Sequence, residues 1–448
     1  MTTAPDVVVH VASTDDCVVE CLEALRRHSP ESRLIIVEDE PAEETAQWSA
    51  AAPAVELLDG MGAGRAAAFN AGLELSESSL VCLMSTRVVV SSGWLKLLEE
   101  ALGADPRTAA VGPVASGLGS QTLEASYIGL EDFELFAAAY NHSDPDKWSH
   151  VLRLSDECLL ARRGAIDAVG GFDESYSFGL FAGDDVSIRF VTAGWSLLRC
   201  GNVLVHYAGP TPLPASQERF VAMERQGLAA RWGFVPDQSL VGNAEIVALV
   251  EGRQRLDVLD LGCACGATLL EIANRHPGSA LYGIERDEHA AAVAACVATV
   301  AIGDVESDLD YPPESFDYVI CDGILEQVRD PWRLLAAVRR LLRPGGRVVA
   351  NVRNVMHLGV VEQLLRGRFH YDDDGVVERS HLRFFTLAEI EELFAGAGFP
   401  SRRYSATALQ VSDAERRLAE TLAESFPPSD RHHLVQQYLI DGYRVLAE

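Results

Sequence analysis

The chain has no excess of basic residues. Lysine and arginine number 37 against 66 aspartates and glutamates, which gives a formal net charge of −29 over 448 residues. A protein that binds a phosphate backbone needs a basic surface, so this charge argues against nucleic acid as a partner. An acidic balance of this size is typical of a protein that its own charge keeps soluble.

Long apolar runs and organised cysteines are also missing. No stretch approaches the roughly 20 apolar residues that cross a bilayer as a helix, and residues 1–6 lack the basic-then-apolar pattern of a secretory signal. The nine cysteines are scattered, and no second pair stands at zinc-site spacing from Cys263 and Cys265. We therefore expect a cytoplasmic protein without a membrane span, a disulfide framework or a bound metal.

The chain is long enough for two or three domains, and its hydrophobic content of 48% is ordinary for a globular protein. Strand-like and helix-like segments alternate in both halves, which predicts two α/β domains. We expect the boundary near residues 235–240, after a helix predicted over 216–232 with Phe220, Met223 and Leu228 inward. The predicted domains are residues 1–235 and 236–448.

The sharpest local motif is a glycine turn between a strand and a helix. Residues 256–261 are an apolar run, Gly262 to Gly266 form a small-residue turn, and residues 267–276 have helical periodicity. Such a turn lets a nucleotide cofactor approach the backbone at a helix N-terminus. Glu285 ends the next apolar strand, 19 residues after Gly266, where a ribose-binding carboxylate belongs.

The glycine pattern is weak by itself, because Ala264 at its middle position rules out a dinucleotide fingerprint. Its context is stronger. Asp304 follows a short predicted strand over residues 300–303, and Asp322 follows another over 316–321. Further strands are predicted over 347–352 and, as the last of the sheet, over 436–446. Strands that alternate with helices at this spacing predict a doubly wound parallel sheet.

The C-terminal half contains a set of phrases that occur together in one enzyme family: VLDLGCACG, YGIERD, GDVE, FDYVICDGILEQVRDPW, LLRPGGRVVANVRN and RSHLRFFT. In these phrases, residues from about 250 to 400 resemble class I S-adenosylmethionine-dependent methyltransferases. They also resemble the members fused to glycosyltransferases in bacterial glycan and natural-product pathways. The resemblance implies a Rossmann-like fold, S-adenosylmethionine as cofactor, and a small-molecule or glycan acceptor.

The resemblance also implies a cofactor site. Glu285 would accept both ribose hydroxyls, Asp260 would orient the methionine end, and the backbone at Asp322 would meet the methionine amine. Asp304 would accept from the adenine amine. The more ordinary alternatives are a turn cap for Asp260 and solvated strand ends for Glu285 and Asp304. The full implied set is Asp260, Gly262, Cys263, Gly266, Glu285, Asp304, Val305 and Asp322.

Transfer of a methyl group to a hydroxyl is helped by a base. Candidates lie between residues 351 and 386, where ERSHLRFFT matches a phrase of the family. His381 is the first candidate, and its alternative is a structural histidine that holds the loop to the sheet. His357 and His370 lie in the same segment, and the run of aspartates over 372–374 there is more typical of a solvated turn. Gln327, where the family often has a histidine, cannot act as a base.

The N-terminal half contains a second set of phrases: IIVED, AAAFNAGLELSE, LMSTRVVVSSGWL, VGPV, CLLARRGAIDAVGGFDE, RFVTAGW and VHYAG. Across residues 6–235 these resemble family 2 glycosyltransferases with the A-type nucleotide-sugar-binding fold. The resemblance implies an α/β domain that binds a nucleotide-sugar. In such enzymes, a strand-end carboxylate holds a divalent cation on the diphosphate.

Two catalytic features of that family are replaced here. Residues 85–87 (Ser-Thr-Arg) occupy the metal slot, and residues 182–183 (Ala-Gly) occupy the slot of the catalytic Glu-Asp pair, directly before Asp184 and Asp185. One interpretation is a non-catalytic domain. The other is a metal-independent transferase in which Arg87 neutralises the phosphates and one of the two aspartates is the base.

Each of these residues also has a more ordinary interpretation. Asp184 and Asp185 could lie in a solvated loop, and Arg87 could form a surface ion pair. His206, in a short strand expected over residues 203–207, matches a family histidine beside the metal. It could equally be a strand-end histidine with a satisfied hydrogen bond.

Three functions therefore remain open. The first is a methyltransferase whose N-terminal domain is a glycosyltransferase relic. The second is a bifunctional enzyme that transfers both a sugar and a methyl group. The third is a non-catalytic binding scaffold.

Overall fold

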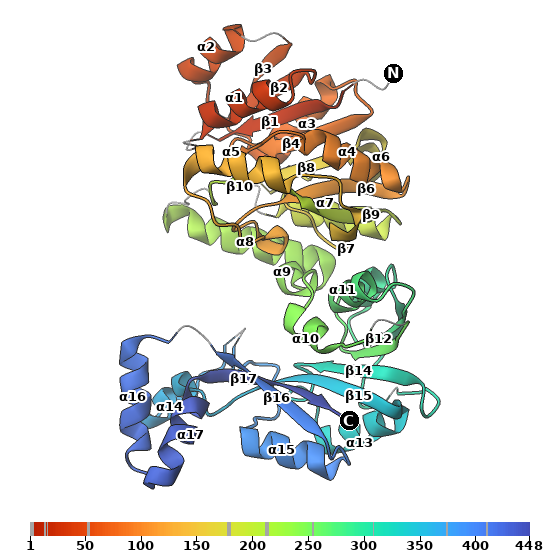
Figure 1. Ribbon diagram of the computed structural model, residues 1–448, viewed down its shortest axis with the longest axis vertical. Coiled ribbons are helices and arrows are strands. Elements are labelled where there is room, and N and C mark those ends of the chain that lie inside the picture. The colour runs from red at the N-terminus through yellow and green to blue at the C-terminus, as the bar shows by residue number, and fades with distance from the viewer. Residues whose placement is uncertain are drawn as a thin grey trace. The chain divides into compact units, whose positions relative to one another are not determined.

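The computed structural model describes residues 4–12, 15, 17–51, 54–176, 181–210, 215–252, 255–307, 309–372, 375–408 and 411–448. The chain divides into two compact units, Met1–Val241 and Gly242–Glu448, and Figure 1 shows the elements of each. This division places the short helix α9 (Pro236–Ser239) in the first unit.

An eight-stranded mixed sheet forms the centre of the first unit, in the order β3-β2-β1-β4-β8-β6-β9-β7. Its first four strands run parallel, and β8 is antiparallel to both of its neighbours. The bounds are β1 (Asp6–Val11), β2 (Leu34–Glu38), β3 (Val55–Asp59), β4 (Leu80–Ser85), β6 (Thr108–Val114), β7 (Trp148–Val151), β8 (Cys158–Arg162) and β9 (Ser196–Leu204).

Helices cover this sheet because each presents an apolar stripe to it. In α4, for example, Trp94, Leu98 and Leu102 recur every four residues and are buried. The larger helices are α1 (Val18–His28), α2 (Glu43–Ala51), α3 (Arg65–Leu75), α4 (Trp94–Ala104), α5 (Gly129–Tyr140), α6 (Arg163–Val169), α7 (Ala182–Thr192) and α8 (Ala215–Trp232).

Two expectations for this unit are wrong. Of the three residues of α8 expected to face inward, only Leu228 is buried, whereas Phe220 and Met223 are exposed. The helix is attached through its C-terminal turn, where Trp232 contacts Asp185. The single strand expected over residues 203–207 is divided, since β10 (His206–Tyr207) pairs with β5 (Val88–Val89) in a separate ribbon.

The second unit is built on a seven-stranded sheet in the order β13-β12-β11-β14-β15-β17-β16. The first five strands are parallel, but β17 is antiparallel to both β15 and β16. The expectation of a wholly parallel sheet is therefore wrong at this edge. The bounds are β11 (Asp257–Leu261), β12 (Ala280–Glu285), β13 (Thr299–Ile302), β14 (Phe316–Asp322), β15 (Leu342–Arg353), β16 (Arg402–Ala408) and β17 (Ile440–Ala447).

Eight helices are described in the second unit. Ile390, Leu393 and Phe394 of α15 are buried, as their spacing predicts. Residues 436–438, expected in the last strand, instead end helix α17. The bounds are α10 (Ala244–Leu249), α11 (Ala267–Arg275), α12 (Glu288–Ala294), α13 (Pro331–Leu341), α14 (Leu358–Leu365), α15 (Leu387–Gly396), α16 (Asp413–Ala423) and α17 (Pro428–Tyr438).

The strand order of the second unit fixes where a ligand can bind. The chain moves outward from β11 to β12 and β13, then returns to place β14 on the other side of β11. The order therefore reverses between β11 and β14, and the loops at the carboxyl ends of these strands diverge there. A crevice at such a point is the usual ligand site of an open α/β sheet.

Candidate cofactor and acceptor site

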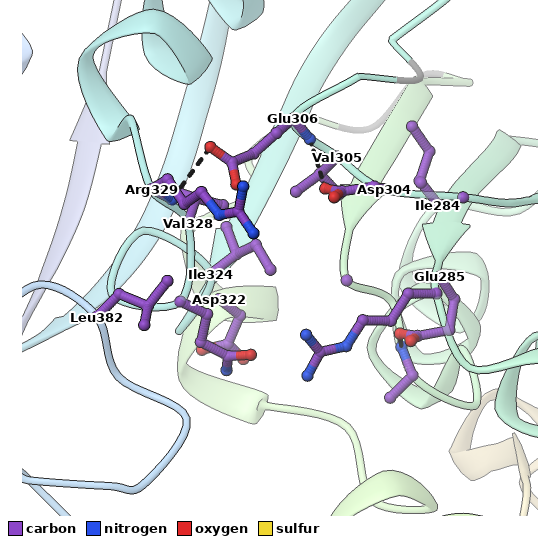
Figure 2. A pocket seen from close by; sticks show the side chains of 15 residues that line it. Ile284, Glu285, Asp304, Val305, Glu306, Asp322, Ile324, Val328, Arg329 and Leu382 are labelled. Atoms are coloured by element: carbon purple, nitrogen blue, oxygen red, sulfur yellow. Dashed lines mark hydrogen bonds between the residues drawn. The ribbon is translucent and has the colours of Figure 1, made fainter.

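A cavity of about 410 Å³ lies at this reversal point of the second unit (Figure 2). Carboxylates, arginines and aliphatic side chains line it together. The lining residues are Gly262, Ala264, Ile284, Glu285, Arg286, Gly303, Asp304, Val305, Glu306, Asp322, Ile324, Gln327, Val328, Arg329 and Leu382.

The turn after β11 brings bare backbone to the cavity. Gly262 has φ +78°, and a Cβ there would lie 3.1 Å from Cδ1 of Ile324. Gly266 has φ +81° at the start of α11, where a Cβ would press on Ala294 and Val297. Gly262 therefore lines the cavity, whereas Gly266 sits behind it and lets the helix pack closely.

The carboxylate of Glu285 is held by backbone groups on both oxygens. Oε2 accepts a hydrogen bond from the backbone N–H of Ala264 at 2.9 Å, and Oε1 accepts one from that of Asp287 at 2.9 Å. A carboxylate has about four lone-pair positions, so each oxygen keeps one for a ligand. The arrangement fixes a hydrogen-bond acceptor at the cavity wall, which suits a vicinal diol.

Two aspartates lie beneath and beside this wall. Asp260 is buried, and its Oδ1 has no hydrogen-bond partner among the described residues. Burial raises the pKa of its carboxyl well above the ordinary value, and the nearby carboxylates of Asp322 and Glu285 raise it further. Asp322 lines the cavity, and its oxygens accept from Nδ2 of Asn351 at 3.0 Å and Nδ2 of Asn243 at 2.8 Å. A cationic ligand group would relieve the crowding of these carboxylates.

The far wall is formed by residues after β13. Oδ1 of Asp304 accepts from the backbone N–H of Glu306 at 2.9 Å. Oε1 of Glu306 accepts in turn from the backbone N–H groups of Arg329 at 3.0 Å and Asp330 at 3.1 Å. This chain of bonds joins the loop after β13 to the loop after β14, and Val305 supplies an apolar surface between them.

The structure divides the implied cofactor residues into two groups. The residues that line the cavity are Gly262, Glu285, Asp304, Val305 and Asp322, and those behind it are Asp260, Cys263 and Gly266. Cys263 packs into the sheet, since a Cβ on Gly283 would lie 2.5 Å from its Sγ, and burial raises the pKa of its thiol.

Sequence reasoning gave no cofactor-binding role to several residues that line the cavity. Gln327, Val328 and Arg329 follow β14, so the rule that ligands gather after the strands would have found them. Asn243 had no such signal, because it contacts Asp322 from 79 positions away.

His381 lies beside the cavity without lining it. Its side chain is buried. Nδ1 lies 3.3 Å from the carbonyl oxygen of Val376 and accepts a hydrogen bond from the backbone N–H of Glu378 at 3.4 Å. Nε2 lies 3.7 Å from Oε2 of Glu378. Burial lowers the pKa of this imidazole, which favours the neutral form. The contacts are those of a residue that holds its own loop, while the next residue, Leu382, reaches the cavity.

The other candidates in this segment have separate places. His357 caps α14, and its Nδ1 accepts from the backbone N–H of Gly359 at 3.3 Å. His370 is exposed, and its Nε2 is 3.5 Å from Oδ1 of Asp372. Residues 373 and 374, the rest of the aspartate run, lie outside the described residues.

Glu326 is a buried carboxyl that sequence reasoning gave no role. Its Oε1 accepts from the backbone N–H of Arg353 at 2.6 Å, and its carbonyl oxygen accepts from the N–H groups of Leu382 at 2.7 Å and Arg383 at 3.0 Å. Burial raises the pKa of its carboxyl to about 7. Glu326 therefore joins the loop after β14, the end of β15 and the segment that carries Leu382.

In the first unit, Arg87 is buried and does not form the surface ion pair that was one alternative. Its Nη1 is 3.4 Å from Oδ1 of Asp15, Nη2 donates to the carbonyl oxygen of Ala208 at 3.2 Å, and Nε donates to the carbonyl oxygen of Gly209. Thr86 donates to the same Asp15 carboxylate. The guanidinium is thus held within the protein.

Neighbouring carboxylates are engaged in the same way. Nη1 of Arg65 lies 2.9 Å from Oε1 of Glu157 and 3.1 Å from Oδ1 of Asp156, and Ser85 donates to Glu157. Among the described residues, no group of three or more histidines, cysteines, aspartates or glutamates is arranged to hold a metal ion.

Asp184 and Asp185 do not lie in a solvated loop. Both are buried in the first turn of α7, because each is paired with a cation or a donor. Oδ1 of Asp184 is 2.9 Å from Nη2 of Arg153. Oδ2 of Asp185 is 2.7 Å from Nη2 of Arg189, and its Oδ1 accepts from Nε1 of Trp232 at 3.0 Å.

His206 has the surroundings of a strand-end histidine. Its Nδ1 is 2.9 Å from the hydroxyl oxygen of Tyr127, and burial lowers the pKa of the imidazole.

In the described part of the chain, no helix combines the length and the apolar character needed to span a membrane.

Comparison with known proteins gives matches to methyltransferases. A family model described as a methyltransferase domain matches residues 241–401. A ubiquinone biosynthesis O-methyltransferase of Aeromonas salmonicida is 27% identical over 155 residues, which is 33% of this chain and 64% of the relative. The trans-aconitate 2-methyltransferase of Deinococcus radiodurans is 29% identical over 108 residues, 24% of this chain and 42% of the relative.

Residues 241–401 are a class I S-adenosylmethionine-dependent methyltransferase domain. All residues that line the cavity fall within this methyltransferase domain. The chain spans 64% of the length of the first of these relatives and 42% of the second. A solved structure of a methyltransferase from Thermotoga maritima, described as a possible histamine N-methyltransferase, is 19% identical to this chain, with a TM-score of 0.32. The match covers 52% of this chain and 96% of the Thermotoga chain.

Proposed function

We propose that this chain binds S-adenosylmethionine in the cavity of its methyltransferase domain and transfers the methyl group to a sugar-bearing or related small-molecule or glycan acceptor. The observation that carries the proposal is the doubly held carboxylate of Glu285 at the cavity wall. It matches the need of a ribose for an acceptor that reaches two hydroxyls at once. When bound, S-adenosylmethionine supplies an electrophilic methyl carbon on a positively charged sulfur.

The other residues fit the remaining parts of the cofactor. Asp322 offers a carboxylate on one side of the cavity, which suits the amine and the sulfonium, and the buried carboxyl of Asp260 would orient the methionine end. Asp304 offers a carboxylate to the adenine amine, and Val305 offers an apolar surface to its ring. The backbone at Gly262 leaves space for the ligand because no Cβ projects from it.

The acceptor's nucleophile must meet the methyl carbon opposite the sulfur, so the protein contributes mainly by alignment. His381 remains our proposed base for a hydroxyl acceptor, because its lowered pKa favours a neutral imidazole beside the segment that lines the cavity. Its contacts with Val376 and Glu378 also support the alternative, in which it only fixes that segment.

For the first unit we propose a glycosyltransferase-like domain that no longer transfers sugar and that serves acceptor binding or assembly. The support is that Arg87, in the slot of the family's metal ligand, and Asp184 and Asp185, directly after the slot of its base, are paired with other residues of the unit. Arg87 is paired with Asp15, and Asp184 and Asp185 are paired with arginines. Removing Arg87 would leave the buried carboxylate of Asp15 without its cation.

Isothermal titration with S-adenosylmethionine tests the proposal. Glu285→Gln replaces one acceptor oxygen by a donor, so we expect affinity to fall by about 1–3 kcal/mol, or roughly 5- to 150-fold. Glu288→Gln is the matched control, since Glu288 is exposed on the neighbouring helix α12 and does not line the cavity. Equal affinities for wild type and Glu285→Gln would remove the ribose assignment, and no binding by wild type would remove the function.

A further inference from the structure

Three aromatic rings gather in the segment that follows α14. Phe369 packs edge-on against Tyr371, with ring centroids 5.3 Å apart, and against Phe384 at 5.6 Å. Tyr371 and Phe384 lie 6.4 Å apart. We call these three residues the aromatic cluster.

The aromatic cluster is partly open to solvent. Phe369 is 39% exposed and Tyr371 is 41% exposed, although both rings touch their neighbours. Leu365 at the end of α14 and Leu382 are exposed as well. Apolar surface is unfavourable in water, so a contiguous apolar patch with a polar rim commonly marks a binding site.

The aromatic cluster and the cavity are joined by one short segment, in which the ring of Phe384 lies 6.4 Å from that of His381, the residue before Leu382. Leu382 is 50% exposed and lines the cavity, and Phe384 lies two residues further along the same segment. The backbone N–H of Leu382 donates to the carbonyl oxygen of Glu326 at 2.7 Å, which fixes this segment at the loop after β14. One short segment therefore carries both a residue of the cavity wall and a ring of the aromatic cluster.

Leu382 lies on the side of the cavity away from Glu285 (Figure 2). In Figure 2, Leu382 and Asp322 lie toward one side of the cavity and Glu285 lies toward the other. If Glu285 holds the ribose, as in the proposed function, Leu382 and Asp322 border the methionine side. An acceptor that reaches the methyl carbon would then pass over Leu382.

We propose that the aromatic cluster binds the body of the methyl acceptor, and that this body is a flat apolar ring system such as an aromatic aglycone. The inference rests on the proposed function, because it takes the cavity as the cofactor site. Rings that pack edge-on present both faces and edges to a flat ligand, and contacts between aromatic rings are favourable beyond the area that they bury. The hydroxyl of Tyr371 adds one polar group to this surface.

The test uses the full chain saturated with S-adenosylhomocysteine and the probe 2-naphthol, whose binding is followed by fluorescence anisotropy. Wild type should bind 2-naphthol more tightly than methyl glucoside, and Phe369→Ala should weaken naphthol binding at least fivefold. Phe426→Ala is the matched control, since Phe426 is an exposed phenylalanine of the same unit outside the cluster. Phe369→Leu, which keeps an apolar side chain, should give an intermediate loss if the alanine variant folds poorly.

The cofactor arm separates the two proposals. S-adenosylhomocysteine should bind wild type and Phe369→Leu equally, and failure to bind wild type would overturn the proposed function itself. If it binds, but 2-naphthol binds no better than methyl glucoside or is unaffected by either Phe369 variant, the cluster is not an acceptor site for flat rings.

Discussion

Nδ2 of Asn243 donates a hydrogen bond to Oδ2 of Asp322 over 2.8 Å, although 79 positions separate the two residues. Oδ1 of the same Asn243 accepts from the backbone N–H groups of Glu245 and Ile246, and so caps α10. One amide therefore ties the first helix of the methyltransferase unit to a carboxylate of the cavity. Asn351 holds the other oxygen of Asp322 at 3.0 Å.

We expect Asn243→Ser to weaken S-adenosylmethionine binding, with a smaller loss of stability than Asn243→Ala because the cap of α10 is kept. Serine is a good N-cap, but its short side chain carries no amide to reach Asp322. The lost hydrogen bond to a charged group corresponds to roughly 1.5–3 kcal/mol. Calorimetry measures the affinity, and urea denaturation measures the stability. Asn243→Ala should lose both, so a serine variant that binds normally would show that Asp322 needs no support from α10.

The buried carboxyl of Glu326 should make stability depend on pH. Its folded pKa of about 7 lies above the ordinary value of 4.5, because burial disfavours the charged form. The folded state therefore binds the proton more tightly, and stability is lost as pH rises from about 4.5 to about 7. The loss is of the order of 3 kcal/mol.

Glu326→Gln removes this titration, because glutamine imitates the neutral acid. We expect the variant to match wild type near pH 5 and to exceed it near pH 8 in the urea midpoint. Glu392→Gln, on the exposed side of α15, is the control and should follow wild type at both pH values. Parallel pH dependences for Glu326→Gln and wild type would contradict the assignment.

His381→Ala should lower methyl transfer with little change in cofactor affinity. The imidazole lies next to Leu382 but does not line the cavity, so its loss affects the acceptor side. Turnover at saturating S-adenosylmethionine and its pH profile are the measurements. His381→Asn keeps a hydrogen-bonding side chain for the loop but supplies no base, so we expect it to remain slow. Near-normal turnover by the asparagine variant would leave only the loop-holding role.

Neither manganese nor magnesium should be required for any activity of this protein. A divalent ion on a diphosphate usually takes one or two protein carboxylates. At the end of β4 the sequence has Ser85, Thr86 and Arg87, and the buried guanidinium of Arg87 would repel a nearby cation. Methyl transfer and titration with a nucleoside diphosphate should give the same results with manganese and with chelator. Tight nucleotide binding that disappears with chelator would point to Asp184 or Asp185 as ligands.

Much of the second unit could be predicted because its signals are local. The apolar strands and the amphipathic helix α15 each depend on residues close together in the sequence. The antiparallel β17 could not be predicted in this way, because strand direction depends on which edge of the sheet the chain reaches. The exposure of Phe220 and Met223 in α8 was missed for the same reason, since helical spacing does not show which turn of a helix will be covered.

The residues of the cavity also divide into those that the sequence predicted and those that it did not. Gly262, Glu285, Asp304 and Asp322 were predictable, because parallel strands bring the residues at their carboxyl ends to one edge. The support that holds these residues was not, because Asn243, Asn351 and Glu306 act through contacts between elements that are separate in the sequence.

The sequence by itself determined which residues could do chemistry: a glycine turn, strand-end carboxylates at regular spacing, and a Ser-Thr-Arg run at the end of β4. These are local patterns, and the backbone geometry that they require follows from adjacent residues. Only the tertiary structure decided which side chains are available. It buried Arg87 and Asp185 in ion pairs, placed Leu382 rather than His381 at the cavity, and left the ring of Phe369 open. Burial and pairing depend on residues distant in sequence, so no local pattern can specify them.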